Sequence, residues 1–328
     1  TGFYRLSLRQ KRNILINNIY GNDIDSQAVE VTQLSLFLKM LEDENQETLI
    51  QKGNLLDVTI LPNLNRNIFH GNSLIGKEIY EQKDLFSEGD FKHLYPFEYW
   101  DNLPKIKLKG GFDAIIGNPP YVKEYTSRET FENIKLGNLK KYYQGKMDLW
   151  YFFTCYGIDL LKDGGILGYI APSNWVSNSG ASILRNKVIH ESKILSFIDF
   201  EDFMVFQNAS IQTMILILLK DKLSDNYSFS SQTFKGKKLK SSEVANEINN
   251  KTNNISIYKY PTVNKEKLKN KFLKFDNLNI DMVLETINSA RNFTLDAKKE
   301  VAQGLVAPQD SLNAKSALAL KNKYPKGT

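Results

Sequence analysis

The residues with the clearest chemical potential are Asn118, Pro119, Pro120 and Tyr121, which directly follow an apolar run. Each proline fixes its own φ and lacks a backbone N–H, and a residue before proline is driven into an extended conformation. The segment is therefore a stiff loop that offers two acceptors, the Asn118 side-chain oxygen and the Pro119 carbonyl, beside the flat ring of Tyr121. Two acceptors and a ring suit a planar group that bears an –NH₂. The alternative is a rigid exit turn with an incidental tyrosine.

The run before this tetrapeptide is an element that could hold it in place. Residues 112–117 (Phe-Asp-Ala-Ile-Ile-Gly) have the pattern of a short buried strand that ends at the proline pair. Ligands of open α/β sheets bind at the carboxyl ends of the strands. The sequence thus predicts a site at the tip of this strand.

Strand and helix patterns alternate through the first 220 residues. The helix expected first takes its N-cap from Asp25 or Ser26 and carries one apolar stripe; the stripe consists of Val31, Leu34, Leu38 and Leu41. The predicted helices span 26–43, 148–162 and 179–192. The predicted strands span 18–23, 67–72, 112–117, 165–171, 194–201 and 213–220.

This alternation predicts an α/β fold with a doubly wound, mostly parallel sheet. The last two strands are separated only by residues 202–212, which are too few for a parallel crossover. We therefore expect 194–201 and 213–220 to form an antiparallel pair at one edge of the sheet, so that one late strand runs against the others.

The bulk composition is globular, with 41% hydrophobic and 24% charged residues in a chain of 328, a length that favours two domains. The one cysteine, Cys155, excludes an internal disulfide and a cysteine zinc site, and it fits a reducing compartment. No signal-peptide pattern opens the chain, and its longest apolar run, 213–219, is too short to span a bilayer. We expect a soluble cytoplasmic protein with no membrane partner and no metal.

Positive charge gathers in the last third of the chain. Residues 221–328 hold 19 lysines and arginines against 11 acidic residues, whereas the first 220 residues are nearly neutral. A polyanion partner and a solvated lysine-rich surface explain this equally well. Residues 221–254 are rich in Ser, Asn and Lys, and we expect a linker or domain boundary there. The chain then divides into domains 1–220 and 221–328.

The tetrapeptide Asn118–Tyr121 resembles the catalytic signature of the amino-methyltransferases that use S-adenosyl-L-methionine. The wider pattern resembles adenine-N6 DNA methyltransferases of the TaqI type, above all the methylase region of type IIG restriction–modification enzymes. The resemblance is strong over 1–220 and weak beyond. It implies a Rossmann-like methyltransferase sheet, followed by the start of a basic DNA target-recognition domain. Three further segments carry it: 20–25 (Tyr-Gly-Asn-Asp-Ile-Asp), 70–74 (His-Gly-Asn-Ser-Leu) and 202–209 (Asp-Phe-Met-Val-Phe-Gln-Asn-Ala).

The resemblance also implies roles for single residues. Asp23, with Ile24 beside it, would bind the cofactor's ribose, although an ordinary Asx turn explains the aspartate as well. Asn72, with Ser73 beside it, stands where the family usually has an acidic residue that binds the cofactor's adenine amine. Phe206 would stack on the target base or simply pack in the core. The start of the helix over 148–162 resembles the lining of the cofactor pocket.

The implied reaction is methyl transfer from S-adenosyl-L-methionine to N6 of adenine in a specific sequence of double-stranded DNA, as the modification part of a restriction–modification system. The base must leave the duplex and would stack on Tyr121 and Phe206. Hydrogen bonds from the amine to Asn118 and Pro119 would localise the nitrogen lone pair and tighten as positive charge develops. No general base is needed, and the three histidines are scattered.

The sequence departs from the family pattern at its front. We find no glycine-rich cofactor loop before Asn18, and residues 6–17 look like the helix that comes after that loop. A nuclease domain in the full-length chain fits the resemblance, but no cluster of paired carboxylates and lysine marks one here. Residues 77–111 form a long insertion that is either DNA-facing or a packed excursion.

Two alternatives to a DNA methyltransferase stay open. Amino-methyltransferases that act on RNA or on protein glutamine share Asn-Pro-Pro-Tyr, and the basic tail and long insertion favour DNA over both. The second alternative is a DNA-binding specificity fragment without activity. Nothing in the sequence specifies an oligomeric state.

Overall fold

The structure is a computed structural model that divides into two compact units, Thr1–Leu278 and Asn279–Thr328. Nearly all the residues that it describes belong to the first unit, which has an α/β fold. The described residues are 6–42, 62–81, 92–206, 211–222, 226–236, 239–252, 254–275, 286–287 and 289–290.

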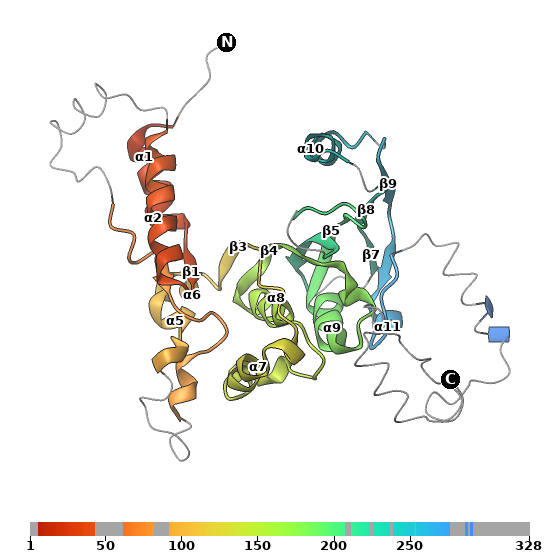
Figure 1. Ribbon diagram of the computed structural model, residues 1–328, viewed down its shortest axis with the longest axis horizontal. Coiled ribbons are helices and arrows are strands. Elements are labelled where there is room, and N and C mark those ends of the chain that lie inside the picture. Colours follow the sequence, from red (N-terminus) through yellow and green to blue (C-terminus); the bar gives the residue numbers. More distant parts are fainter. Residues whose placement is uncertain are drawn as a thin grey trace, which may run out of the picture. The chain divides into compact units, whose positions relative to one another are not determined.

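A six-stranded sheet forms the centre of the first unit (Figure 1). Its order is β3 (Phe112–Gly117), β4 (Leu161–Pro172), β6 (Thr213–Lys220), β5 (Ser192–Asp199), β8 (Ser230–Phe234) and β9 (Ser256–Lys259). β3 runs parallel to β4, and β5 runs parallel to β8. β6 is antiparallel to both β4 and β5, and β9 is antiparallel to β8. Four of the six strands therefore share one direction.

The predicted α/β fold, its mostly parallel sheet and the antiparallel pairing of the two late strands are confirmed. The predicted position of that pair is wrong, because β6 lies between β4 and β5 and two more strands come beyond β5. Its apolar residues explain this position: Leu216 and Leu218 pack on one face of the sheet, while Ile215 packs on the other. A strand that is apolar on both faces belongs in the interior of a sheet rather than at its edge.

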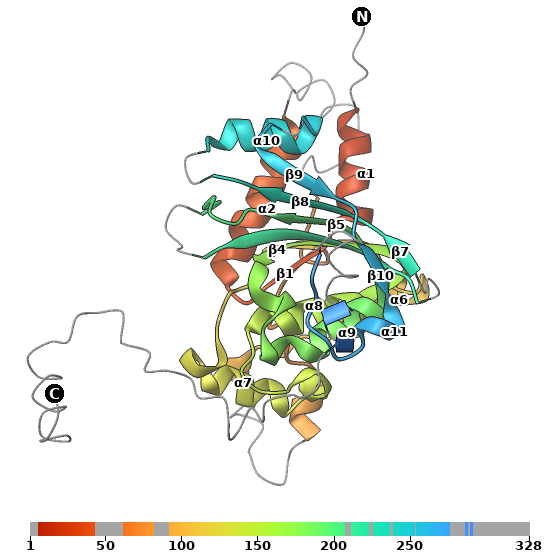
Figure 2. The same ribbon diagram turned by 90° about the vertical axis from the view of Figure 1, so that its right-hand side faces the viewer.

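The two faces of the sheet are covered by different helices (Figure 2). α8 (Leu149–Leu160) and α9 (Ser182–Glu191) pack on one face over β4 and β5 and form the main core. α10 (Ser241–Asn250) contributes Val244 to a smaller core on the opposite face, with Phe200, Phe203 and Phe234. Because successive side chains of a strand point to opposite faces, Phe197 joins the main core and Ile198 the smaller one.

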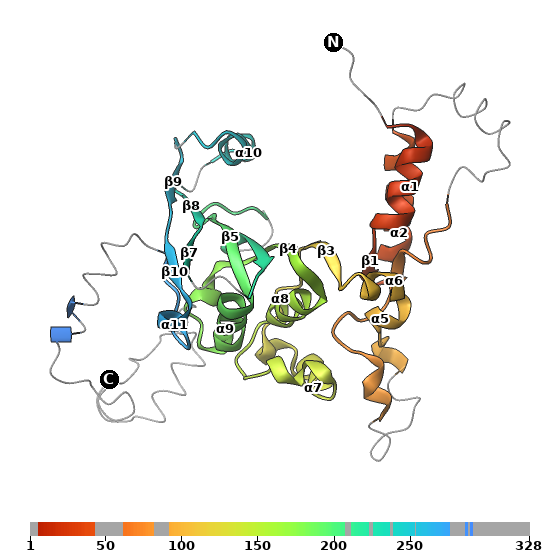
Figure 3. The same ribbon diagram turned by 180° about the vertical axis from the view of Figure 1, so that it is seen from behind.

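A separate two-stranded parallel sheet joins β1 (Gly21–Asp23) to β2 (Ile68–His70). α1 (Leu8–Asn18) and α2 (Ser26–Leu41) run beside each other next to it (Figure 3). The predicted helix cap is confirmed, since the Asp25 side chain accepts a hydrogen bond from the Gln27 N–H at 2.9 Å. The helix packs, however, through Val29 and Met40. Three residues of the predicted apolar stripe are more than half exposed: Val31, Leu34 and Leu38.

The described part of the insertion 77–111 packs against the chain around it. Phe97, Leu103 and Ile106 are buried, and the Trp100 ring stacks on Phe112 of β3 with 6.3 Å between centroids. Its elements are the 3₁₀ helices η1 (Lys77–Glu81) and η2 (Lys92–Leu94) and the short helices α5 (Tyr99–Asn102) and α6 (Pro104–Leu108).

The sheet continues past Lys220, where the sequence pattern changes. β8 adds to β5 through buried residues such as Ser231 and Phe234, and β7 (Asn226–Ser228) pairs with β10 (Thr262–Asn264). The Lys237-Lys238 pair and the lysine-rich end of the chain lie outside the described residues. The remaining elements are η3 (Glu124–Thr126), α7 (Arg128–Lys135), η4 (Asn138–Tyr142), η5 (Ser173–Val176), η6 (Ser179–Ala181) and α11 (Lys265–Leu268).

A polar cluster joins the C-terminal end of α8 to α9 and η4. Asp159 accepts hydrogen bonds from Lys187 Nζ at 2.7 Å, from Lys141 Nζ at 3.2 Å and from the Tyr142 hydroxyl. Lys187 is almost fully buried and also pairs with Glu191 at 2.8 Å. Burial opposes ionisation of Asp159, but the bonds from Lys187 and Tyr142 outweigh it and hold the pKa of this carboxyl below its ordinary value.

We expect Asp159→Asn to lower the free energy of unfolding by about 1–3 kcal/mol, the usual loss for hydrogen bonds to a charged group. Urea unfolding at pH 7 measures it. A carboxyl whose pKa is lowered by folding stabilises the protein above its unfolded-state pKa, and this contribution is lost as the pH falls through the folded-state pKa. The difference between the variant and the wild type should therefore shrink in acid. A difference that is independent of pH would contradict this role for the charge.

Candidate functional site

The Asn118-Pro119-Pro120-Tyr121 loop lies at the carboxyl end of β3, as predicted. The last residue of the strand, Gly117, pairs with Tyr169 of β4. A Cβ at position 117 would lie 3.1 Å from the Tyr169 ring, so a glycine lets the strand tip approach this closely without displacing the ring. Asn118 and Pro120 are exposed, Pro119 is buried, and Tyr121 is half-buried.

The structure brings Asn118 and Tyr121 into direct contact. The Tyr121 hydroxyl donates to Asn118 Oδ1 at 2.7 Å and faces a second acceptor, the Ile170 carbonyl of β4, at 3.0 Å. Burial, and to a smaller degree the charge of Asp148, raises the pKa of Tyr121 to about 12. The phenol therefore stays a neutral donor at physiological pH, and its ring is anchored to the end of β4.

Both predicted acceptors keep room for a further donor. An amide oxygen carries two lone pairs, so Asn118 Oδ1 can accept a second hydrogen bond beside that from Tyr121. No described residue forms a backbone hydrogen bond to the Pro119 carbonyl. The described residues therefore leave Asn118 Oδ1 with one lone pair free and give the Pro119 carbonyl no backbone donor.

The ends of β1 and β2 are tied together by a polar network. The Asn22 side-chain nitrogen donates to Ser73 Oγ at 2.9 Å and to the Gly71 carbonyl at 3.1 Å, and the Tyr99 hydroxyl donates to the same Ser73 Oγ at 3.0 Å. The Asn22 side-chain oxygen is buried and has no hydrogen-bond partner among the described residues. This network places Ser73 at the end of the small sheet, next to the strand that carries Asp23.

The other residues predicted to bind the cofactor make local turns. Asp23 Oδ1 accepts from the Asp25 N–H at 2.9 Å, which is the Asx turn that the sequence left open as the alternative. Asn72 Oδ1 accepts from the Leu74 N–H at 3.0 Å. Asp23 and Ile24 are exposed, so both remain accessible to a ligand.

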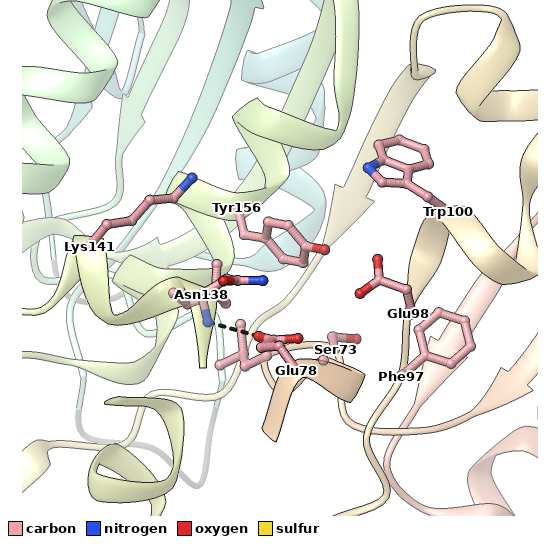
Figure 4. A pocket seen from close by; sticks show the side chains of 11 residues that line it. Ser73, Glu78, Phe97, Glu98, Trp100, Asn138, Lys141 and Tyr156 are labelled. Carbon is pink, nitrogen blue, oxygen red and sulfur yellow. Dashed lines mark hydrogen bonds between the residues drawn. The ribbon is translucent and has the colours of Figure 1, made fainter. Parts of the chain in front are cut away.

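A cavity of about 190 Å³ opens beside Ser73 (Figure 4). It is lined by residues from the insertion, from η4 and from α8, and Figure 4 shows the Tyr156 hydroxyl pointing across it toward Glu98 and Trp100. Of the residues predicted as site residues, Ser73 is the one that lines it. The lining side chains that matter for its chemistry are Glu78, Phe97, Glu98, Trp100, Asn138, Lys141 and Tyr156.

The cavity combines aromatic rings with two carboxylates. Glu78 accepts a hydrogen bond from the Asn138 N–H at 2.8 Å. Burial raises the pKa of Glu98, and the nearby charges of Glu78 and Asp101 add to this shift. The charge of Lys141 is already paired with Asp159. Rings and carboxylates together suit a flat ligand that carries amine hydrogens or positive charge.

Phe206 lies beyond the carboxyl end of β5, in a segment that packs on the smaller core. Phe203 is buried against Phe200, with 6.2 Å between the ring centroids, whereas Phe206 is half-buried. The structure brings this segment to the same side of the sheet as Ile170, which also borders the smaller core. The stacking role predicted for Phe206 stays a prediction.

Sequence reasoning missed two groups of residues. Glu98 and Tyr156 carried no motif, and the only signal was the aromatic content of the insertion and of α8. Lys123 and Asp148 form an ion pair next to the Asn118–Tyr121 loop, with 2.8 Å between Nζ and Oδ2.

Among the residues that the structure describes, no cluster of histidine, cysteine or carboxylate side chains could hold a metal ion. No helix in the described ranges combines the length and the apolar character that a bilayer crossing requires.

Comparison with known proteins finds related sequences from type II restriction–modification systems. The chain is 36% identical over 231 residues to the type II restriction enzyme and methyltransferase RM.Eco57I of Escherichia coli, a match that covers 69% of this chain and 21% of that protein. It is 25% identical over 183 residues to the type II methyltransferase M.AccI of Acinetobacter calcoaceticus, which covers 52% of this chain and 34% of the relative. The chain thus spans a fifth to a third of the length of these relatives.

Solved structures that share the fold include two with DNA or a DNA mimic. One is a nuclease-deletion mutant of the type ISP restriction–modification enzyme LlaGI with a DNA substrate mimic, at a TM-score of 0.50 and 15% identity, over 84% of this chain and 22% of that one. The other is the DrdV–DNA complex, at a TM-score of 0.51 and 13% identity, over 84% of this chain and 26% of that one. The family described as Eco57I restriction-modification methylase matches residues 17–206, which include the strand tip, the Asn118–Tyr121 loop and α8. The chain belongs to the Eco57I restriction–modification methylase family.

Proposed function

We propose that this chain transfers a methyl group from S-adenosyl-L-methionine to N6 of adenine in double-stranded DNA, as the modification part of a restriction–modification system. One observation carries the proposal. A proline-rich loop at the tip of β3 holds the Asn118 side-chain oxygen at 2.7 Å from the Tyr121 hydroxyl, in a chain of a methylase family. An exocyclic amine on a planar base is the group that this arrangement fits.

The residues at the ends of β1 and β2 fit the methyl donor. The cavity beside Ser73 offers aromatic rings to a purine, and its carboxylates Glu78 and Glu98 suit amine hydrogens and the positive charge of a sulfonium. Asp23 stands at the neighbouring strand end, where an acidic residue can accept from ribose hydroxyls. When bound, S-adenosyl-L-methionine supplies a methyl group on a positively charged sulfur.

The chain's own residues prepare the amine for attack. Tyr121 offers its ring to the extruded base, at about 1–3 kcal/mol per base–aromatic stack, which offsets part of the few kcal/mol that base extrusion costs. Asn118 and Pro119 accept the two amine hydrogens and favour a pyramidal nitrogen with a localised lone pair. Both acceptors bind more tightly as positive charge develops on the nitrogen, so they stabilise the transition state more than the ground state.

DNA as the partner is supported by the neighbours and by charge. The two solved structures described above were determined with DNA or a DNA mimic. The 19 basic residues in 221–328 could neutralise phosphates, which would make binding fall steeply with salt. We propose that domain 1–220 carries the chemistry and that 221–328 begins the region that recognises the target sequence.

A methyl-transfer assay tests the proposal and its alternatives together. The full-length protein with isotope-labelled S-adenosyl-L-methionine should label duplex DNA, and base analysis should find N6-methyladenine. Labelling of ribosomal RNA or of release-factor protein instead would identify one of the other amino-methyltransferase classes. If none of these three substrates is labelled, and calorimetry detects no binding of S-adenosyl-L-methionine, the result supports a specificity fragment without activity.

The cavity beside Ser73 gives its own prediction. Trp100→Ala should weaken binding of S-adenosylhomocysteine by about 2- to 30-fold. One aromatic ring that lines a site contributes about 0.5–2 kcal/mol to the binding free energy of a flat or cationic ligand. Isothermal titration calorimetry measures the change. Leu108→Ala is the matched control, since Leu108 lies in the neighbouring helix α6 and is 88% exposed. Equal affinities of the two variants would show that the cofactor binds elsewhere.

A further inference from the structure

Asp148 has a buried carboxylate and lies opposite Lys123, in the segment that follows the Asn118–Tyr121 loop. Its side chain is 0% exposed, and the Lys123 side chain, whose Nζ lies 2.8 Å from Oδ2, is 32% exposed. Neither oxygen of Asp148 accepts an aligned hydrogen bond from the described residues, so the contact with Lys123 is an ion pair only. Asp148 is the N-cap residue of α8, but its side chain does not cap the helix.

Such an arrangement is poorly explained by stability alone. Taking a carboxylate out of water is strongly unfavourable, and a single ion pair repays that loss incompletely, so buried pairs are weak evidence for stability. A pair of this kind can instead fix one conformation over others. Its effect then depends on which parts of the molecule it joins.

Backbone contacts show that the pair joins the exit of the loop to the start of α8. The Leu149 N–H donates to the Val122 carbonyl at 2.8 Å, and the Glu124 N–H donates to the Met147 carbonyl at 3.0 Å. Lys123 and Asp148 face each other between these two bonds as an antiparallel bridge. Lys123 is two residues from Tyr121, so any shift at this bridge reaches the loop directly.

The α8 side of the bridge is itself rigidly held. The Gln144 side chain accepts hydrogen bonds from Ser182 Oγ at 2.9 Å and from the Ile183 N–H at 2.7 Å, which ties the segment to α9. Gly180 packs so closely on Lys146 that a Cβ would lie 1.9 Å from its carbonyl oxygen. Asp148 is therefore a fixed point, and Lys123 is the partner that it restrains.

We propose that Asp148, through its ion pair with Lys123, is a positioning residue that holds the Asn118–Tyr121 loop in the geometry needed for methyl transfer. This inference rests on the proposed function of that loop. The Asp148 side chain is 0% exposed and therefore offers no surface to a ligand. It acts by keeping the two acceptors and the ring where the amine must meet them, since a misplacement of about 1 Å can lower a rate by about 100-fold.

Asp148→Asn in the full-length protein tests the inference. Asparagine keeps the size of the side chain, and Lys123 can turn to water, so the fold should survive. We expect the single-turnover methyl-transfer rate to fall by about 10- to 100-fold, while the Kd for DNA changes by less than about threefold. A 2-aminopurine at the target position should still brighten on binding, because the base still leaves the duplex.

Variants of Lys123 provide a second measurement. Lys123→Arg keeps the charge and should retain a rate within about threefold of the wild type, whereas Lys123→Gln should match Asp148→Asn. The double variant Asp148→Asn/Lys123→Gln should be no slower than either single one, because both changes break the same pair. Losses that multiply in the double variant would overturn the inference.

The matched control is Glu191→Gln at the end of α9. It breaks another carboxylate–lysine pair, that of Glu191 with the buried Lys187, so it should lower the melting temperature but keep the single-turnover rate below that temperature. A rate for Asp148→Asn within about twofold of the wild type would overturn the positioning role alone. A wild-type protein that methylates no DNA would instead overturn the proposed function.

Discussion

Asn118→Ala should lower the single-turnover rate of methyl transfer by about 100- to 1,000-fold, the loss seen when one group that stabilises transition-state charge is removed. Binding of DNA should remain nearly unchanged, because the role proposed for Asn118 is a contact with the amine and not with the phosphates. The rate is measured with labelled S-adenosyl-L-methionine, and the Kd by fluorescence anisotropy of a labelled duplex. The loop should keep its shape, since Tyr121 retains its second acceptor, the Ile170 carbonyl.

Two further substitutions define what Asn118 contributes. Asn118→Asp keeps an acceptor at the same place and should retain more of the rate than the alanine variant. Asn65→Ala is the control at an exposed asparagine outside the site, and it should leave the rate unchanged. Normal turnover of Asn118→Ala would remove Asn118 from the mechanism.

The second large effect is expected at Tyr121. Tyr121→Ala should lower kcat/KM by about 5- to 150-fold, the equivalent of a stack worth about 1–3 kcal/mol. The enhanced fluorescence of 2-aminopurine at the target position should change as well, because the extruded base loses the surface on which it rests. The two measurements together separate weaker base capture from slower chemistry.

Tyr121→Phe separates the ring from the hydroxyl. The variant keeps the ring but loses the bonds to Asn118 and Ile170. We expect kcat/KM to fall by about 2- to 13-fold, since a neutral hydrogen bond contributes about 0.5–1.5 kcal/mol net. If phenylalanine were as damaging as alanine, the hydroxyl rather than the ring would be the functional group, and the stacking role would be rejected.

The sequence alone determined the local elements, including the strand that carries the Asn118–Tyr121 loop. The apolar run 112–117 and the two prolines after it dictate a strand that ends in a stiff turn, because both effects act within a few residues. The cap at Asp25 and the antiparallel pairing of β5 with β6 were predictable for the same reason: a short connection and a capping side chain are local constraints.

Only the tertiary structure decided which distant residues meet. β6 lies inside the sheet because it pairs with β4 as well as with β5, and β5 in turn is covered by β8, a later strand within the polar stretch that favours a linker. The cavity beside Ser73 assembles Glu98 and Tyr156 from segments with no shared motif. The pairing of Lys123 with Asp148 joins two segments that are separated by η3, α7 and η4. Contacts of this kind come from the packing of whole elements against one another, so a pattern along the chain does not predict them.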